Sequence, residues 1–357
     1  MNYGSDSKTA VQARYDAQKI AFAPIMFQAS RALRNLGILE TLKEHRKSGL
    51  TIEEVAEKCS VSVYGAKVLL EAGISLELVY VADSKFFITK TGWFILKDEL
   101  TRVNMDFTHD VNYPGFFSLQ QSIVNGAPEG LKTFGNWRTI YEGLSHLPQH
   151  VQKSWFAFDH YYSDVAFPAI LPVIFKPEPQ KILDVGGNTG KFAVQCAEYN
   201  EKVAVTILDL PGQLAKAEKV IEQHGLTDRI TCVAADLLDH SKPFPVEYDA
   251  IWMSQFLDCF SQEDIVELLR RAKAAIHDEG FIYILETYWD KQRFEASTYC
   301  LHSTSLYFTC MANGCSQMYH SEDMLKLVNR AGLEVVETVG EIGISHTLFS
   351  CVKQTEI

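Results

Sequence analysis

Short apolar segments alternate with amphipathic segments from Gln180 to the end of the chain. Strands are predicted at 181–185, 203–208, 229–234, 248–254, 279–286, 333–340 and 345–352, with helical spacing between most of them. This alternation is typical of a mostly parallel, doubly wound sheet. Only a short turn around Gly343 separates the last two segments, so we expect them to pair as an antiparallel hairpin. The pattern predicts an α/β fold with a Rossmann-like, seven-stranded sheet whose last strand is reversed.

The first hundred residues carry a different pattern. Apolar positions recur at helical spacing between about residues 13 and 46, and Pro24 is expected to start or kink a helix there. Thr51 precedes an acidic helix start, and a second helix is predicted from Val63 to Ser75. The segments 79–81 and 86–89 then resemble a β-hairpin. Residues 1–100 are therefore predicted to form a helical, winged-helix domain whose apolar surface needs a partner.

Residues 101–172 are predicted to be helical and are rich in aromatic side chains, including Trp137, Tyr141, Trp155 and Phe158. We interpret this segment as a bridge to the sheet domain at 173–357. Such side chains pack well between domains, and ligand cavities also favour apolar walls at domain junctions. The segment is expected to contribute to a substrate pocket.

The run from Lys181 to Phe192 predicts a strand, a tight glycine turn and a helix start. Its glycines do not follow the dinucleotide pattern, and Asp184 at the strand end would repel a pyrophosphate but attract a cationic amino group. A second carboxylate, Asp209, ends the next strand 19 residues after Gly190 and is placed to accept from ribose hydroxyls. A ligand that has a cationic amino group and a ribose but no phosphate matches S-adenosylmethionine (SAM).

Composition narrows the function further. The 357-residue chain is 47% hydrophobic, carries a net charge of −12, and has neither an apolar run of membrane-spanning length nor the apolar core of a signal peptide at its start. Its eight cysteines are scattered without zinc-site spacing, so no metal site is expected and a cytoplasmic location is favoured. Between Thr51 and Tyr80 the chain has two lysines and five glutamates. This excess of negative charge disfavours binding of DNA by the winged helix.

The chain resembles the class I SAM-dependent methyltransferases. It is most similar to the small-molecule O-methyltransferases with an N-terminal winged-helix dimerisation domain, a group that includes plant caffeate and acetylserotonin methyltransferases. The resemblance runs from about residue 15 to residue 352. The segments that carry it are 184–190, Asp209-Leu210-Pro211, Ala235-Asp236-Leu237 and 257–264.

The resemblance implies roles for the residues of these segments. Asp184 and the glycine turn (Gly186, Gly187, Gly190) would hold the methionine part of SAM, and Asp209 would bind the ribose. Leu210 would pack on the adenine, and Asp236 would accept from the adenine amino group. The cofactor-binding set also includes Leu237 and Ser254. Asn188 stands where many members have glycine.

The catalytic position departs from the family. Members have Leu-His-Asp-Trp where this chain has Leu257-Asp258-Cys259-Phe260, so the histidine base is replaced by Asp258. Glu286 matches a carboxylate that flanks the base. Burial could raise the pKa of Asp258 by several units and so make it a better base. If the acceptor is itself acidic, holding it close to the methyl group of SAM could suffice for transfer without a base. His160 is a further candidate base, although a packing or surface histidine is the more common case.

The sequence thus predicts a cytoplasmic homodimer that transfers a methyl group from SAM to a small, aromatic, hydroxylated acceptor, without nucleic-acid or membrane partners. O-methylation is the leading hypothesis. C-methylation of a phenolic ring is one alternative, and a catalytically silent SAM-binding or regulatory protein is another.

Overall fold

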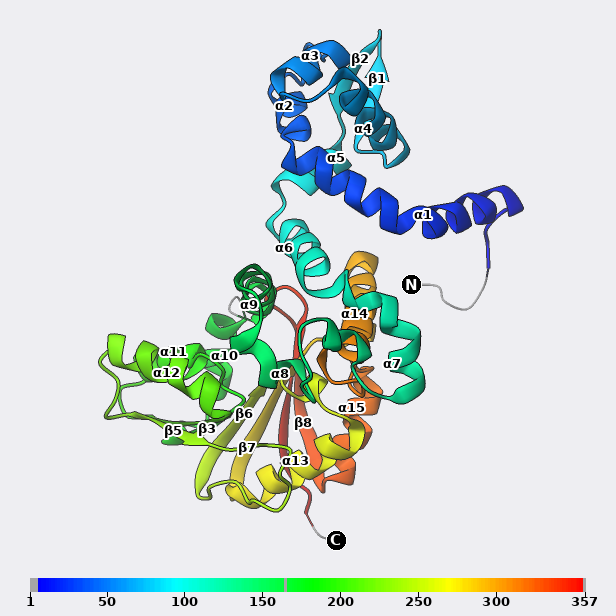
Figure 1. The fold of residues 1–357 in the computed structure, drawn as a ribbon. Coiled ribbons are helices and arrows are strands. Elements are labelled where there is room, and N and C mark those ends of the chain that lie inside the picture. Colours follow the sequence, from blue (N-terminus) through cyan, green and yellow to red (C-terminus); the bar gives the residue numbers. More distant parts are fainter. Residues whose placement is uncertain (1–5, 164–165, 356–357) are drawn as a thin grey trace. The chain divides into compact units, whose positions relative to one another are not determined.

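The computed structural model describes residues 6–163 and 166–355 (Figure 1). The chain divides into two compact units, residues 1–108 and 109–357. The first unit contains α1 (Ala10–Asn35), α2 (Ile38–Glu44), α3 (Ile52–Lys58), α4 (Val63–Ser75), β1 (Val79–Ala82), β2 (Lys85–Ile88), α5 (Lys90–Lys97) and α6 (Glu99–Phe107). The order α3, α4 and an antiparallel β1–β2 hairpin confirms the predicted winged helix.

The helix starts of this unit follow from local capping. The Thr51 hydroxyl accepts the backbone N–H of Glu54, whose carboxylate accepts the N–H of Thr51, so α3 begins where the sequence predicts. The expectation that Pro24 starts a helix is wrong, because Pro24 lies inside α1. The start signal is Thr9, which forms a capping box with Gln12, and α1 continues through Pro24 despite the backbone hydrogen bond that an internal proline removes.

The second unit opens with short helices that precede the sheet. They are η1 (Thr108–Asn112), η2 (Gly115–Ser118), α7 (Leu119–Asn125), η3 (Glu129–Thr133), α8 (Ile140–Gly143), η4 (Leu144–His146), α9 (Gln149–Ser163) and α10 (Phe167–Ile174). Later in the chain, η7 (Phe308–Ala312) packs with several of them, and α14 (Glu295–Tyr307) joins α9 through the hydrogen bond from Trp155 to the Tyr307 hydroxyl. Gly115 and Gly130 lie so close to Met311 of η7 that an added Cβ would clash with its sulfur. Segments far apart in the sequence therefore form one helical layer.

A seven-stranded sheet forms the body of this unit, as the sequence predicts. Its strands, in the order β5-β4-β3-β6-β7-β9-β8, are β5 (Ile230–Ala234), β4 (Ala204–Asp209), β3 (Lys181–Val185), β6 (Tyr248–Ser254), β7 (Ile276–Glu286), β9 (His346–Lys353) and β8 (Leu333–Ile342). Strand β9 is antiparallel to both of its neighbours, and the pairs among the first five strands are parallel. Chain order reverses at β3, so the carboxyl ends of β3 and β6 border a natural ligand crevice.

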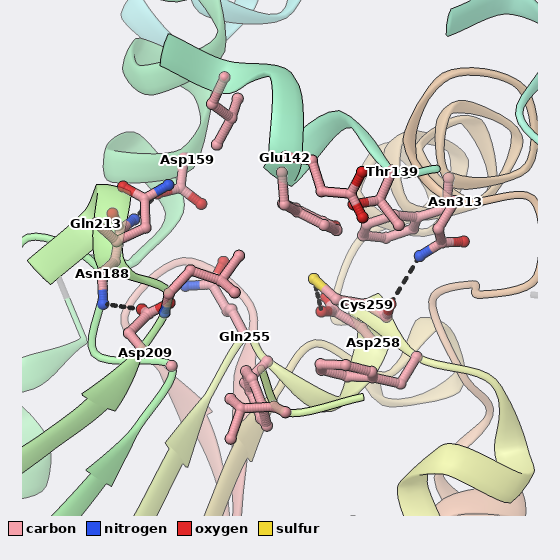
Figure 2. Close-up of a pocket in the computed structure, with 18 of the residues that line it drawn as sticks. Thr139, Glu142, Asp159, Asn188, Asp209, Gln213, Gln255, Asp258, Cys259 and Asn313 are labelled. Atoms are coloured by element: carbon pink, nitrogen blue, oxygen red, sulfur yellow. Dashed lines mark hydrogen bonds between the residues drawn. The ribbon is translucent and has the colours of Figure 1, made fainter. Parts of the chain in front are cut away.

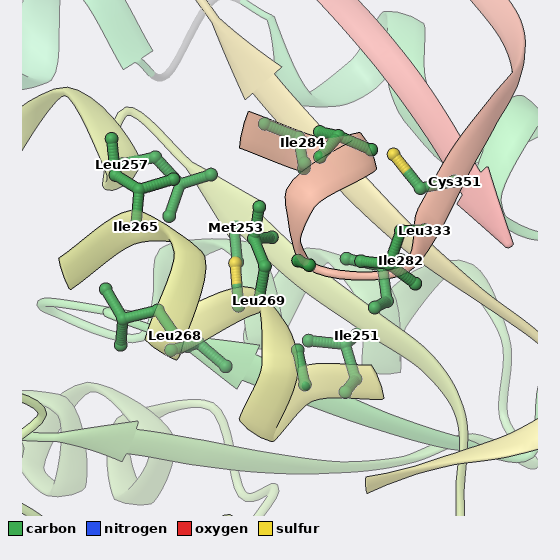
Figure 3. Packing of buried hydrophobic residues seen from close by; sticks show 14 of the residues in the cluster. Ile251, Met253, Leu257, Ile265, Leu268, Leu269, Ile282, Ile284, Leu333 and Cys351 are labelled. Atoms are coloured by element: carbon green, nitrogen blue, oxygen red, sulfur yellow. The ribbon is translucent and has the colours of Figure 1, made fainter. Parts of the chain in front are cut away.

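Helices cover both faces of the sheet. Ile182 and Trp252 face α10, α11 (Lys191–Tyr199) and α12 (Pro211–Gln223), while alternate strand residues face α13 (Gln262–Ala275) and α15 (Ser321–Arg330). Figure 3 shows Ile251 and Met253 of β6 packed against leucines of α13. This alternation explains the nearly continuous apolar runs of the strands, because both faces are buried.

Trp252 is a large buried residue whose packing in the sheet core can be tested by mutation. It is 1% exposed and stacks on Phe192 with ring centroids 4.3 Å apart. Trp252→Ala should lower the unfolding free energy by about 3–5 kcal/mol because it leaves a large cavity. Tyr299→Ala, an aromatic truncation at a position 76% exposed, is the control and should change it by less than about 0.5 kcal/mol. Urea unfolding measures both, and equal effects would contradict this packing.

Candidate active site

The turn after β3 is built by backbone conformations that side chains disfavour. Gly186 has φ +75° and Gly190, the N-cap of α11, has φ +76°. Asn188 also lies in the left-handed region, at φ +50°. Gly187 is needed for space, since a Cβ there would lie 2.6 Å from Oδ2 of Asp184. The turn therefore wraps closely around a buried carboxylate.

Asp184 is 2% exposed, and its Oδ2 has no hydrogen-bond partner in the structure. Burial raises the pKa of the Asp184 carboxyl group to about 8, with a further contribution from the negative charge of Asp209. A donor or a cation from a ligand would restore the ordinary ionised state.

Asp209, at the end of β4, holds the same turn. Its Oδ2 accepts the backbone N–H of Asn188 at 2.8 Å, and its Oδ1 accepts that of Leu210 at 2.6 Å. Burial raises the pKa of Asp209, and these two backbone bonds oppose the rise. The carboxylate assigned to a ribose from the sequence thus also fixes the turn, a contact that the sequence did not reveal.

A cavity of about 380 Å³ opens beside this turn (Figure 2). In Figure 2, Asn188, Asp209 and Gln213 lie on one side, and Asp258, Cys259 and Asn313 lie on the other. Its walls include the aromatic side chains Tyr141, Trp155, Phe158, Tyr162, Phe256, Phe260, Tyr307 and Phe308. A smaller hollow of about 80 Å³ adjoins the turn and shares Asp159, Gly186, Asn188 and Gln255 with the large cavity.

The predicted cofactor residues divide between these two spaces. The large cavity is lined by Gly186, Asp209, Leu210, Asp236 and Leu237, and the smaller hollow by Asp184, Gly186, Gly187 and Ser254. Gly190 lines neither space and instead starts α11.

The residues around the turn fit a polar, cationic ligand. Buried polar atoms without a hydrogen-bond partner gather there: Asp184 Oδ2, Asn188 Oδ1, Gln213 Oε1, Ser254 Oγ and Gln255 Nε2. Buried polar groups in native proteins are rarely left unpaired. Most of these atoms are acceptors, which suits the ammonium and hydroxyl groups of SAM.

Asp258 lies in the turn η5 (Leu257–Cys259) after β6 and lines the cavity while only 5% exposed. Its Oδ1 accepts the thiol of Cys259 at 3.4 Å. Burial raises the pKa of Asp258 to about 7; the thiol lowers it and the charge of Asp159 raises it. A carboxylate of this kind can exchange protons near neutral pH.

Glu286 is the last residue of β7 and does not line the described cavity. Its Oε1 accepts the backbone N–H groups of Phe256 at 3.0 Å and Leu257 at 2.8 Å. Burial, and then the charge of Asp258, raise the pKa of Glu286 well above its ordinary value. Glu286 therefore supports the backbone that carries Asp258.

His160, on α9, lines the smaller hollow and stacks on Phe156 with ring centroids 6.0 Å apart. It is absent from the lining of the large cavity that contains Asp258. Asn313 is a further residue of the site that no sequence motif indicates: its Nδ2 donates to the Cys259 carbonyl at 2.7 Å and so fixes the turn around Asp258. Nothing in the local sequence signals that contact, which joins positions 54 residues apart.

Two segments of the chain match known domain families. Residues 14–86 match the Dimerisation2-like domain, and residues 170–334 match the O-methyltransferase domain. The chain is 26% identical over 272 residues to an L-tyrosine C(3)-methyltransferase of Streptomyces lavendulae, covering 75% of this chain and 73% of the relative. It is 23% identical over 243 residues to a 3-hydroxy-5-methyl-1-naphthoate 3-O-methyltransferase of Streptomyces sahachiroi, covering 67% and 68%.

A solved structure has the same fold along nearly the whole chain. The S-adenosylmethionine-dependent methyltransferase SibL in its apo form matches with a TM-score of 0.71 and 25% identity, over 94% of this chain and 98% of that one. Fold, site and relatives define a class I methyltransferase whose cofactor is SAM. The chain thus carries a Dimerisation2-like domain followed by an O-methyltransferase domain. Within residues 6–163 and 166–355, none of the helices has the length and apolar content needed to span a bilayer.

The raised pKa of Asp184 predicts how stability depends on pH. The pKa of this carboxyl group is higher in the folded protein than in the unfolded chain, where it is about 3.9. The group therefore adds its full contribution to stability below pH 3.9, and that contribution is lost as the pH rises to the pKa of the folded protein. The unfolding free energy of the ligand-free protein should therefore fall between pH 5 and 8, by at most about 1.4 kcal/mol per pH unit for this group. Urea unfolding should show a smaller fall in Asp184→Asn. An unchanged slope in that variant would contradict the raised pKa.

Proposed function

We propose that this chain transfers the methyl group of SAM to a small, hydroxylated aromatic acceptor bound in the large cavity. The observation that carries the proposal is that one aromatic-walled cavity is lined by both the glycine turn, at Gly186 and Asn188, and the buried Asp258. A donor at the turn and an acceptor at Asp258 would then share one water-poor space. Proximity and alignment supply much of the rate acceleration in such transfers.

The cofactor would lie along the carboxyl ends of β3, β4 and β5. Asp184, the turn glycines and Ser254 would bind its amino-acid end, Asp209 its ribose, and Leu210, Asp236 and Leu237 its adenine. The unpartnered atoms around the turn support this placement. When bound, SAM supplies an electrophilic methyl group.

Asp258 is the proposed base or orienting group for the acceptor hydroxyl, and Glu286 is its positioning residue. A pKa of about 7 for Asp258 suits proton transfer near neutral pH, since general bases work best close to the operating pH. Glu286 holds the N–H groups of Phe256 and Leu257 and so fixes the turn. His160 remains a second candidate for the base. It is the weaker candidate because it lines the smaller hollow and not the large cavity.

Methylation of a ring carbon is the second candidate function. An ionised phenol is nucleophilic at oxygen and at its ortho carbon, so one cavity serves either reaction. The similarity to an enzyme named as an L-tyrosine C(3)-methyltransferase favours methylation at carbon. The similarity to a naphthoate O-methyltransferase favours methylation at oxygen. SAM labelled with ¹³C in its methyl group, incubated with a panel of phenols, separates them: the carbon shift of the product distinguishes a methoxy group from an aryl methyl group. Absence of labelled product from every phenol would contradict the proposed acceptor class.

Asp258→Asn should lower kcat by roughly 10²- to 10⁴-fold, the usual range for loss of a general base. Binding of S-adenosylhomocysteine, measured by calorimetry, should change little because the proposed cofactor contacts lie on the other side of the cavity. His160→Gln is the matched comparison and should retain most of the activity. A wild-type rate for Asp258→Asn across the pH range, with loss in His160→Gln, would reverse the two assignments. A smaller loss confined to KM would mean that Asp258 only orients the acceptor.

The first unit is proposed to form a homodimer. Helix α1 exposes Val11, Ile20, Phe22 and Ile25, each more than half exposed, and residues 14–86 match a Dimerisation2-like domain. Several large apolar side chains left exposed along one helix often mark an interface. The eight free cysteines fit a reducing cytoplasm, where the dimer would act.

Sedimentation equilibrium at micromolar concentration should give the mass of two chains. Replacing Ile20 and Ile25 by aspartate should shift the mass toward a monomer, because buried unpaired charges oppose association. Val246→Asp, which adds a charge at an exposed position of the second unit, is the control and should leave the mass unchanged. A monomeric wild-type protein would contradict the dimer.

A further inference from the structure

Asn188 has a side chain that the backbone of the glycine turn does not require. Its φ of +50° lies in the left-handed region, which glycine adopts without strain. The hydrogen bond from its backbone N–H to Oδ2 of Asp209, at 2.8 Å, would form equally with glycine. A glycine at position 188 would therefore satisfy the turn, and the role of the Asn188 side chain has to be sought in its own contacts.

The amide group of Asn188 is held in one orientation. Its Nδ2 donates to Oδ2 of Asp159 at 2.9 Å. A carboxylate oxygen accepts hydrogen bonds, so the amide nitrogen faces Asp159 and the amide oxygen faces away from it. Among the described residues, that oxygen, Oδ1, is buried and has no hydrogen-bond partner. The side chain thus presents an oriented acceptor that lacks a donor.

This unpartnered oxygen belongs to a residue that lines both the large cavity and the smaller hollow. Asp209, the proposed ribose carboxylate, lines the first space, and Asp184 lines the second. A ligand that extends from one space into the other would pass Asn188, because both spaces share this residue. SAM carries donors at both ends, in its ammonium group and its ribose hydroxyls. Since buried carbonyl oxygens in native proteins are nearly always paired, such a donor is the expected partner of Oδ1.

The nitrogen of the same amide contacts a helix that lines the acceptor space. Asp159 lies on α9, which also contributes Trp155, Phe158 and Tyr162 to the wall of the large cavity. Asn188 and Asp159 are 29 residues apart in the sequence, so the amide joins two segments that are otherwise separate in the chain. Because an amide group is planar, a donor bound to Oδ1 also fixes the direction in which Nδ2 points.

We propose that the Asn188 side chain binds the cofactor and positions α9 at the same time: its Oδ1 accepts a hydrogen bond from an N–H or O–H group of SAM, and its Nδ2 holds Asp159. This inference rests on the proposed function and adds to it a residue that links the cofactor to the acceptor cavity. Toward the acceptor, Asn188 is a positioning residue, because it acts through α9.

Asn188→Gly removes the side chain and keeps a backbone that suits the turn. Binding of S-adenosylhomocysteine, measured by calorimetry, should weaken about 5- to 50-fold, the range between a neutral and a charge-assisted hydrogen bond. Asn200→Gly is the matched control, because Asn200 caps the end of α11 and lines neither space. That variant should bind as the wild type does. Wild-type affinity in Asn188→Gly would overturn the inference.

Two ligands identify the group of the cofactor that donates to Oδ1. The nucleoside 5′-deoxy-5′-methylthioadenosine has the ribose and adenine of S-adenosylhomocysteine but lacks its amino-acid end. If a ribose hydroxyl donates, Asn188→Gly weakens binding of both ligands. If the ammonium group donates, the variant weakens binding of S-adenosylhomocysteine alone. Either result supports the contact and assigns it, and unchanged affinity for both ligands would contradict it.

A double-mutant cycle at Asp159 tests the link to α9. Asp159→Asn keeps an oxygen that accepts from Nδ2 of Asn188, Asp159→Leu keeps none, and both remove the charge. Asp159→Leu should therefore bind S-adenosylhomocysteine more weakly than Asp159→Asn, by about threefold or more. In the Asn188→Gly background the two variants should bind alike, because the amide that distinguishes them is gone. A difference of the same size in both backgrounds would contradict the link.

Steady-state kinetics extend the test to the acceptor, with SAM saturating and the phenol that the labelling panel shows to be methylated. Relative to Asp159→Asn, Asp159→Leu should raise KM for that phenol by about 3- to 10-fold, the range of one hydrogen bond, with a smaller change in kcat. Equal KM values would contradict the positioning of α9 by Asn188. If S-adenosylhomocysteine binds and no phenol is methylated, the proposed function fails, and the calorimetric experiments still decide whether Asn188 contacts the cofactor.

Discussion

The active site depends on carboxylates that are buried before any ligand arrives. Asp184, Asp258 and Glu286 are each at most 5% exposed, and burial raises the pKa of all three. An isolated charge in such surroundings is costly, so each group either holds a proton or needs a donor. Ligands that bring cations and hydroxyls remove that cost. Acids therefore gather in the site proposed for SAM, which is itself a cation.

The parallel sheet makes this arrangement possible. Asp184 and Asp209 lie at or near the carboxyl ends of neighbouring strands β3 and β4, and Glu286 ends β7 beside β6. Backbone N–H groups of the turns at this edge donate to Asp209 and Glu286. Those bonds fix the two turns from which Asn188 and Asp258 face one cavity, so the same acids shape the site and set its charge.

Much of this could be predicted from the sequence because it rests on local pattern. The apolar runs of the strands, the glycine turn and the capping box at Thr51 each depend on residues close together in the chain. The contacts of Asp159 with Asn188 and of Asn313 with Cys259 join positions 29 and 54 residues apart, and periodicity carries no signal for them. His160 shows the same limit, since helical spacing could not indicate that it lines the smaller hollow rather than the cavity of Asp258.

The central claim is that buried, ligand-responsive carboxylates define the site, and carboxyl-carbon NMR of aspartate-labelled protein tests it most directly. Titration of the free enzyme should give Asp258 a pKa of about 7 and Asp184 a pKa of about 8, assigned with Asp258→Asn and Asp184→Asn. In the S-adenosylhomocysteine complex the pKa of Asp184 should fall, because the ligand's ammonium favours the ionised form. Ordinary pKa values near 4 for both groups in the free enzyme, unchanged by the ligand, would contradict the account.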